Sequence, residues 1–348
     1  MSTPSVLSAR LGALRTKARG HGPLIILLAV LLFALLRYRN FYNPFNVSAI
    51  LSSTDLLCIG LMAIGLTFVI AAGEIDLSVA GVAVCASVVT ALLAPLGAPV
   101  AVMAGVAVGI VLGLANGVLV AFVGLPSFIV TLAMLLATRG LSLILADRGR
   151  VPVDYSFPLV SFYSTKFWGL VPLPLLVVVG IAIVAGLVLS RSPFGIHVLA
   201  IGGDRESAVL MGLKEGWIRC VIFVITGSLS GLAGVFLLAK TTTGNPLEAQ
   251  GWELTAIAAV VLGGTLLSGG RGSIASTSVG VGLLAIVFQI LNYENGQGIP
   301  INSYWQNVIR GVFVLAIVIV QAVGARADQR RRAVEAARFH GNPIPSAQ

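Results

Sequence analysis

Long apolar runs, separated by short polar or glycine-rich breaks, fill most of this chain. Several runs approach the roughly 20 residues that an α-helix needs to cross a bilayer. The breaks carry glycine, proline and charged residues, which end helices or connect them. The pattern predicts about ten spans, at residues 23–36, 56–72, 78–94, 100–123, 127–146, 170–190, 217–239, 254–267, 274–292 and 304–323.

Composition supports this interpretation. The chain is 57% hydrophobic and only 10% charged, whereas a soluble domain carries about 25% charged residues. The 40 glycines suit helices that pack closely in lipid. The sequence therefore predicts an all-α polytopic membrane protein, with a transmembrane domain over residues 23–325 between polar tails at 1–22 and 326–348.

The basic residues predict an orientation. An even number of spans puts both termini on one side, and most of the 22 Lys and Arg residues fall on that side. Loops on the cytoplasmic side of a membrane are enriched in Lys and Arg, so we expect both termini in the cytoplasm. The net charge of +9 follows from this bias and does not indicate nucleic acid as a partner.

One interruption, residues 191–219, is long and mixes charge, glycine and helix-forming residues. It is either a solvated connecting loop or a short helical platform that holds another protein. In the predicted orientation it is the only sizeable internal segment in the cytoplasm. We call it the coupling segment, and its candidate contact residues are Gly195, Gly202, Gly203, Asp204, Arg205, Glu206, Met211 and Gly212.

A second candidate is the break at residues 73–78, which places Glu74 and Asp76 between two apolar runs. Ionisable groups at membrane depth are costly and mark functional sites. Asp76 and Ser78 also fit helix N-capping, which needs a short polar acceptor ahead of an apolar run. We favour a cap or interface anchor over direct substrate contact.

Two spans carry further polar groups. Asn116 lies beside a row formed by Gly105, Gly109, Gly113 and Gly117, a spacing that predicts a close-packing helix face. Asn116 then bonds a neighbouring helix or faces a cavity. Arg139 meets a substrate hydroxyl or a carboxylate such as Asp147, or its side chain extends to the outer interface.

The sequence argues against catalysis and nucleotide binding. The run at residues 263–271 is glycine-rich, but Gly270 stands where a phosphate-binding loop needs lysine. The three histidines are dispersed, and neither HExxH nor GxSxG occurs. The three cysteines are read as small hydrophobic residues, not as metal ligands. We therefore expect neither an enzyme nor a bound metal or cofactor.

An internal similarity is also present. Residues 59–92 and 257–284 each consist of an apolar run, a glycine-rich break and a second run of small residues. Transporters often contain structural repeats. Glycine- and alanine-rich composition also produces such similarity by chance, and the sequence alone leaves both explanations open.

Five motifs in order carry a family resemblance. They are LTFVI at 66–70 with IDLSV at 75–79; PSFIVTL at 126–132 with RG at 139–140; AIGG at 200–203 with Ala208 and Met211-Gly212; GWEL at 251–254 with AIAAVVLGGT at 256–265 and LSGGRG at 267–272; and YWQ at 304–306. Together they resemble the ribose-type branch of bacterial ABC sugar permeases. Two positions depart from that family, with Glu74 in place of a usual glycine and Asp204 in place of a common asparagine.

The resemblance implies a type II ABC importer permease fold in the bacterial inner membrane. It implies a second permease copy or paralogue, ABC ATPase subunits that carry the ATP and Mg²⁺, and a periplasmic sugar-binding protein that delivers a monosaccharide or polyol. The coupling segment would dock on the ATPase. Residues of the translocation path or of helix breaks would be Asp76, Ser78, Asn116, Arg139, Glu253, Gly269 and Gly270.

The main alternative is a secondary transporter or channel that works without ATPases. Such a protein needs ionisable groups within its spans to use an ion gradient. Apart from the groups near Asp76 and Arg139, the predicted spans are nearly free of them. A membrane scaffold without transport activity is the third class.

Overall fold

The computed structural model describes residues 22–38, 41–296 and seven further positions between 305 and 319. The chain divides into a unit of residues 1–299 and a unit of residues 300–348. The first unit holds all elements discussed below. The expected tails, apart from Gly22, and most of the expected span at 304–323 lie outside the described residues.

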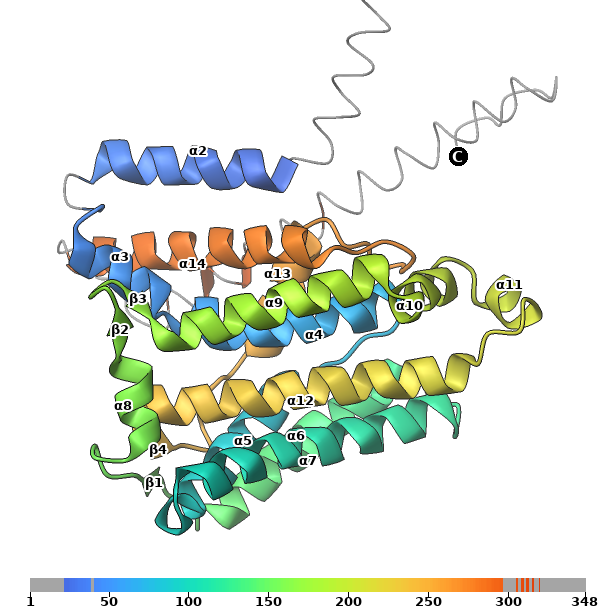
Figure 1. Ribbon diagram of the computed structural model, residues 1–348, viewed down its shortest axis with the longest axis horizontal. Helices are drawn as coiled ribbons and strands as arrows, with labels where there is room; N and C mark the ends of the chain where they lie inside the picture. The colour runs from blue at the N-terminus through green and yellow to red at the C-terminus, as the bar shows by residue number, and fades with distance from the viewer. Residues whose placement is uncertain are drawn as a thin grey trace, which may run out of the picture. The chain divides into compact units, whose positions relative to one another are not determined.

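The first unit is mainly helical (Figure 1). Its elements are α2 (Gly22–Arg37), α3 (Pro44–Leu51), η1 (Asp55–Ile59), α4 (Gly60–Ala71), α5 (Val79–Leu92), η2 (Ala94–Leu96), α6 (Ala98–Ala121), α7 (Ser127–Leu145), β1 (Val151–Pro152), α8 (Pro158–Ser164), β2 (Lys166–Phe167), β3 (Val171–Pro172), α9 (Leu173–Arg191), α10 (Pro193–Gly203), α11 (Arg205–Leu210), α12 (Glu215–Thr241), β4 (Thr243–Gly244), α13 (Trp252–Leu262) and α14 (Ile274–Gly296).

Six helical runs in the described part of the chain are long and apolar enough to cross a membrane. They are Pro44–Ala71, Ala98–Ala121, Ser127–Leu145, Leu173–Arg191, Glu215–Thr241 and Ile274–Glu294. Four shorter apolar helices lie between them: Pro23–Arg37, Val79–Leu92, Pro193–Gly203 and Trp252–Leu262. The polytopic helical class is therefore confirmed, while the count of about ten spans stays a prediction.

The structure corrects three sequence expectations. The run predicted at 56–72 begins earlier, at Pro44, because Asn43 caps a short helix there by accepting a bond from Phe45 N. The run predicted at 254–267 is helical only as far as Leu262. The fold is also not purely α, since β1 pairs with β4 and β2 with β3, each over two residues.

The connections gather at two ends of the helix bundle, as Figure 1 shows. The strand end holds α3, α8 and the four strands. There, Tyr163 Oη and Lys240 Nζ both donate to Ser52 O, at 3.1 and 3.2 Å. The opposite end holds α10 and α11 and the breaks at 73–78 and 263–273, and we call it the α10–α11 end.

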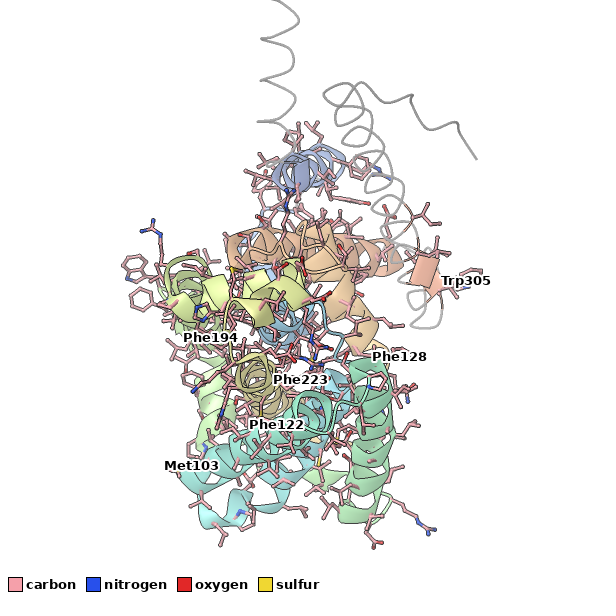
Figure 2. The ribbon with its side chains drawn as sticks, turned by 90° about the vertical axis from the view of Figure 1, so that its right-hand side faces the viewer. Met103, Phe122, Phe128, Phe194, Phe223 and Trp305 are labelled. Carbon is pink, nitrogen blue, oxygen red and sulfur yellow. The ribbon has the colours of Figure 1, made fainter. Side chains whose placement is uncertain are left out.

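The core forms around α12, which packs against α4, α5 and α6. A Cβ added to Gly109 would lie 2.1 Å from Gly227 O, and one added to Gly113 would lie 2.5 Å from Phe223 O. The predicted packing role of the α6 glycine row is thus confirmed. Phe223 is fully buried among the helices, while Met103 on α6 is 72% exposed (Figure 2).

One of the short apolar helices, α13, is preceded by a loop that runs along α5. Gly244 lies against Val88 and Ala91 near the end of α5, whereas Ala249 packs on Ala80 and Val84 near its start. Residues 244–251, which we call the re-entrant loop, therefore follow α5 backwards over roughly 10 Å. The helix α13 then begins in the interior of the bundle, and its 11 residues extend only about 16 Å.

Candidate functional site

The first part of the site is a backbone contact among glycines at the α10–α11 end. Gly270 N donates to Ala71 O at 2.9 Å. A Cβ added to Gly202 would lie 1.9 Å from Ala71 O and 2.7 Å from Gly270 N, and one added to Gly269 would lie 2.6 Å from Gly202 O. Gly73, Gly202, Gly269 and Gly270, with Ala71, form what we call the glycine junction. It joins α10 directly to both helix breaks.

Local chemistry explains why glycine occupies the two breaks. Gly73 has φ +80°, Gly269 +81° and Gly270 +76°, a region that side chains with a Cβ disfavour. Gly73 N donates to Ile70 O, and Glu74 N donates to Val69 O. This pair of bonds is a Schellman motif, which satisfies the last carbonyls of α4 and ends the helix.

The coupling segment forms two short helices followed by the start of α12. Ser192 Oγ caps α10 by accepting from Gly195 N at 3.2 Å, and Gly195 lies so close to α9 that its Cβ would be 2.2 Å from Leu189 O. Asp204 caps α11 by accepting from Ser207 N at 3.1 Å. The pKa of Asp204 lies below its usual range because the Ser207 hydroxyl and backbone N–H donate to its carboxylate.

The outer face of the coupling segment is exposed. Leu210 and Met211 are 82% and 73% exposed, and Glu206 is exposed as well. Arg205 Nη2 donates to Glu215 Oε1 at 2.8 Å, which ties α11 to the start of α12. Gly212, at φ +85°, has open space around it.

The predicted residues of this segment therefore separate into two groups. Gly195 and Gly202 make close backbone contacts, and Gly203 lies beside Gly270. The others lie on α11 or directly beside its two ends and are exposed: Asp204, Arg205, Glu206, Met211 and Gly212.

The break at 73–78 is closed by its own polar groups. Asp76 Oδ1 accepts from Ser78 N at 2.8 Å and from Ser78 Oγ at 2.6 Å. Asn116 Nδ2 of α6 donates to Ser78 Oγ at 2.9 Å. All three residues are 1% exposed. The N-cap position of α5 is Ser78, whose side chain makes no capping bond, so the capping role of Asp76 stays a prediction. Asn116 bonds a neighbouring segment, which is one of the two interpretations predicted.

The helix α7 holds the backbone of the same break. Ile75 N donates to Ser127 Oγ at 3.2 Å, and Thr131 Oγ1 donates to Ile75 O at 3.3 Å. Backbone groups removed from water need such partners. The 73–78 segment is thus tied to α6 through Ser78 and to α7 through Ile75.

Sequence reasoning missed an ion pair. Glu74 Oε1 accepts from Arg219 Nε at 2.7 Å and lies 2.6 Å from Arg219 Nη2. The side chains are 12% and 6% exposed. Glu74 is one of the two positions that depart from the pattern of the family that the sequence resembles, and Arg219 is the last residue of the coupling segment. The sequence carried one signal for this pair. Glu74 and Arg219 have opposite charges, and each stands at one end of an apolar run on the side predicted to face the cytoplasm.

Arg139 and Glu253 lie away from the glycine junction, beside the re-entrant loop. Arg139 Nη1 donates to Glu248 O and Nη2 to Ala249 O, both at 2.8 Å. Arg139 thus binds backbone carbonyls of that loop and not the Asp147 carboxylate considered from the sequence. Glu253 stands in the first turn of α13, and its Oε2 is buried without a hydrogen-bond partner among the described residues.

Comparison with known proteins identifies the class. A family model described as "Branched-chain amino acid transport system / permease component" matches residues 48–318. The L-arabinose transport system permease protein AraH of Escherichia coli is 35% identical over 303 residues, covering 86% of this chain and 89% of that protein. The ribose import permease protein RbsC of Bacillus subtilis is 34% identical, covering 86% and 91%.

The D-allose transport system permease protein AlsC of Escherichia coli is 31% identical over 297 residues, covering 84% of this chain and 88% of that protein. No solved structure matches the chain. These proteins are permeases and not enzymes, and they match the type of family that the sequence motifs predicted. The chain therefore belongs to the family of ABC transport permease components, multi-pass proteins of the inner membrane.

Proposed function

We propose that this chain is the permease subunit of an ATP-driven importer, and that it forms the membrane path for a monosaccharide or related polyol. The family description names branched-chain amino acids, but the relatives compared above are named for L-arabinose, ribose and D-allose. Those relatives match nearly the whole of the chain, so they are the better guide to the substrate.

The proposal requires partners. ATP and Mg²⁺ bind to separate ABC ATPase subunits, because the glycine-rich run at 263–271 lacks the lysine of a phosphate-binding loop. A periplasmic sugar-binding protein delivers the substrate, and a second permease copy or paralogue completes the path.

The observation that carries the proposal is the glycine junction. The coupling segment presents exposed side chains on one face, while its Gly202 contacts Ala71 and Gly270 on the other. Because these are backbone contacts without side chains between them, a displacement of α10 moves both breaks together. An ATPase that docks on Leu210, Met211 and their neighbours would thereby act on α4, α5, α13 and α14.

The orientation forms part of the proposal. The α10–α11 end and both termini face the cytoplasm, since most basic residues of the sequence fall on that side. The strand end then faces the periplasm, and the loop at 147–170 and the start of the 240–253 loop receive the binding protein, because residues 244–251 run back into the bundle. Crosslinks from the binding protein that reach only the coupling segment would overturn this orientation.

A direct test combines genetics with binding. Deletion of this chain in its host should abolish uptake of one sugar or polyol from a radiolabelled panel, and the same compound should bind the periplasmic protein encoded beside it. The complemented strain is the control. If deletion leaves uptake of every panel sugar unchanged, or if only branched-chain amino acid uptake is lost, the proposal is wrong.

A further inference from the structure

The re-entrant loop lies near the middle of the length of the helix bundle. Ala249 packs on Ala80 and Val84 of α5. Gly81 of α5 lies in turn against Thr138, near the middle of α7, and a Cβ added to it would be 2.2 Å from Thr138 Oγ1. The loop therefore runs beside the central turns of a membrane-spanning helix, and not at the strand end where α12 finishes.

Part of this loop is exposed on the surface of the chain. Leu247 is 63% exposed, Gln250 is exposed, and Glu248 and Gly251 are half-buried. Irregular backbone at membrane depth is tolerated only where it is buried in protein or lines a water-filled cavity, because lipid offers no hydrogen bonds. An exposed glutamine and a non-helical backbone are thus incompatible with lipid at this position.

The lipid-compatible surfaces of the same unit have a different composition. Exposed side chains along the spans are apolar, such as Val111 on α6, Leu136 on α7 and Ile183 on α9, at 62%, 67% and 58% exposure. The re-entrant loop interrupts this apolar surface with an amide side chain and a non-helical backbone. The face of the loop that carries Gln250 therefore needs an aqueous space or another protein surface beside it, and not lipid.

The loop is also held in a defined shape. Arg139 binds the carbonyls of Glu248 and Ala249, each at 2.8 Å. Asn245 Nδ2 donates to Glu248 Oε1 at 3.1 Å, and Asn245 Oδ1 accepts from Leu247 N at 3.1 Å. Side chains displayed from such a framework keep their positions, which binding to a particular ligand requires.

We propose that the exposed face of residues 247–251 lines the aqueous translocation path midway across the membrane and contacts the transported polyhydroxyl compound. Gln250 offers both a donor and an acceptor to sugar hydroxyls. Glu253 follows the loop in the first turn of α13, and its buried Oε2 has no hydrogen-bond partner among the described residues. This inference rests on the proposed function and names the part of the chain that meets the substrate.

Thiol accessibility in the assembled transporter tests the inference. Leu247→Cys and Gln250→Cys are made singly in a background where Cys58, Cys85 and Cys220 are replaced by alanine. Leu141→Cys is the matched control, because Leu141 is 42% exposed on α7, two residues beyond Arg139 and about 200° further round the helix. Each variant is reconstituted with its ATPase and binding protein and treated with a charged methanethiosulfonate reagent.

We expect the two loop cysteines to react at least roughly tenfold faster than the control, because the charged reagent reaches aqueous surfaces and not lipid-facing ones. Addition of sugar with ATP should change the rate at position 250 and not at position 141. Reaction as slow as that of the control would overturn the inference. So would an efficient disulfide between two permease copies at position 250, which would make this face a dry interface.

Uptake measurements separate this inference from the proposed function. Gln250→Leu should alter the relative uptake rates of different sugars, whereas Leu141→Ala should not. If the unsubstituted transporter imports no sugar, the proposed function itself fails. If it imports sugar while Gln250→Leu keeps every relative rate, the proposed function stands and the contact between loop and substrate is refuted.

Discussion

Two non-helical segments adjoin α5, the 73–78 segment and the re-entrant loop, and they differ in how their polar groups are satisfied. In the 73–78 segment, Asp76 and Ser78 are 1% exposed and bond each other, and Asn116 bonds Ser78. In the re-entrant loop, the backbone is anchored by Arg139, yet Gln250 stays exposed. One segment is closed by protein and the other is open on one face.

This difference assigns the two segments different tasks. A closed segment that shares a backbone junction with α10 is suited to transmit movement, because the backbone of Ile75 and the side chains of Asp76 and Ser78 are already bonded to protein. An open segment with a fixed backbone is suited to contact a solute. Substitutions in the first should therefore change coupling to ATP, and substitutions in the second should change transport of particular sugars.

The largest effect is expected for Gly202→Val. Its Cβ would lie 1.9 Å from Ala71 O, so α10 must move away from both breaks. We predict loss of ATP-driven uptake while the protein still reaches the membrane, measured by sugar uptake and membrane abundance. Gly180→Ala is the control, since its Cβ meets nothing within 4 Å. Normal uptake by Gly202→Val would refute the transmitting role of the junction.

The Glu74–Arg219 pair should give the next largest effect. Glu74→Gln leaves the largely buried Arg219 charge without its partner, and breaking a buried pair costs about 3–5 kcal/mol. We expect a lower melting temperature and more ATP hydrolysed per sugar imported, and the exchange Glu74→Arg with Arg219→Glu should partly restore both. Additive losses in the double variant would show that the two charges do not act as a pair.

Substitution of Arg139 tests the open segment. Arg139→Leu removes two hydrogen bonds to the carbonyls of Glu248 and Ala249, and bonds to charged groups each contribute about 1.5–3 kcal/mol. We predict slower uptake with an unchanged ratio of ATP hydrolysed to sugar imported. Should that ratio rise as it does for Glu74→Gln, the proposed division of tasks between the two segments would be wrong.

The smallest effect concerns Asp204, which belongs to neither segment. Its pKa is lowered in the folded protein by bonds from Ser207, so its contribution to the stability of α11 is present above the unfolded pKa of about 3.9 and disappears as the pH falls through the folded value. The protection of α11 amides against hydrogen exchange, after correction for the intrinsic effect of pH on the exchange rate, should fall at acidic pH, and Asp204→Asn should weaken this dependence. Equal pH dependence in both proteins would exclude the cap as its cause.

The sequence predicted the class and most helices because apolar length and glycine spacing are local properties. The packing role of the α6 glycine row followed from such signals. The glycine junction did not, because Gly73, Gly202 and Gly269 come from three segments far apart in the sequence. The run at 254–267 was already short for a membrane span, but the end of α13 was hidden, since the apolar run continues beyond the point where Gly263 and Gly264 end the helix.

The internal similarity between residues 59–92 and 257–284 corresponds to two comparable arrangements. The first contains α4, a glycine-containing break and α5, and the second contains α13, a glycine-rich break and α14. The two breaks meet at the glycine junction through the bond from Gly270 N to Ala71 O. Whether the two parts share a repeat origin stays a prediction.

The most direct test of the account is transport by purified components. Liposomes that contain this permease with its ATPase, supplied with the periplasmic binding protein, should accumulate a sugar or polyol only when ATP and Mg²⁺ are present on the ATPase side. An imposed ion gradient without ATP should produce no accumulation. Uptake by this chain alone, driven by an ion gradient, would contradict the account and establish a secondary transporter.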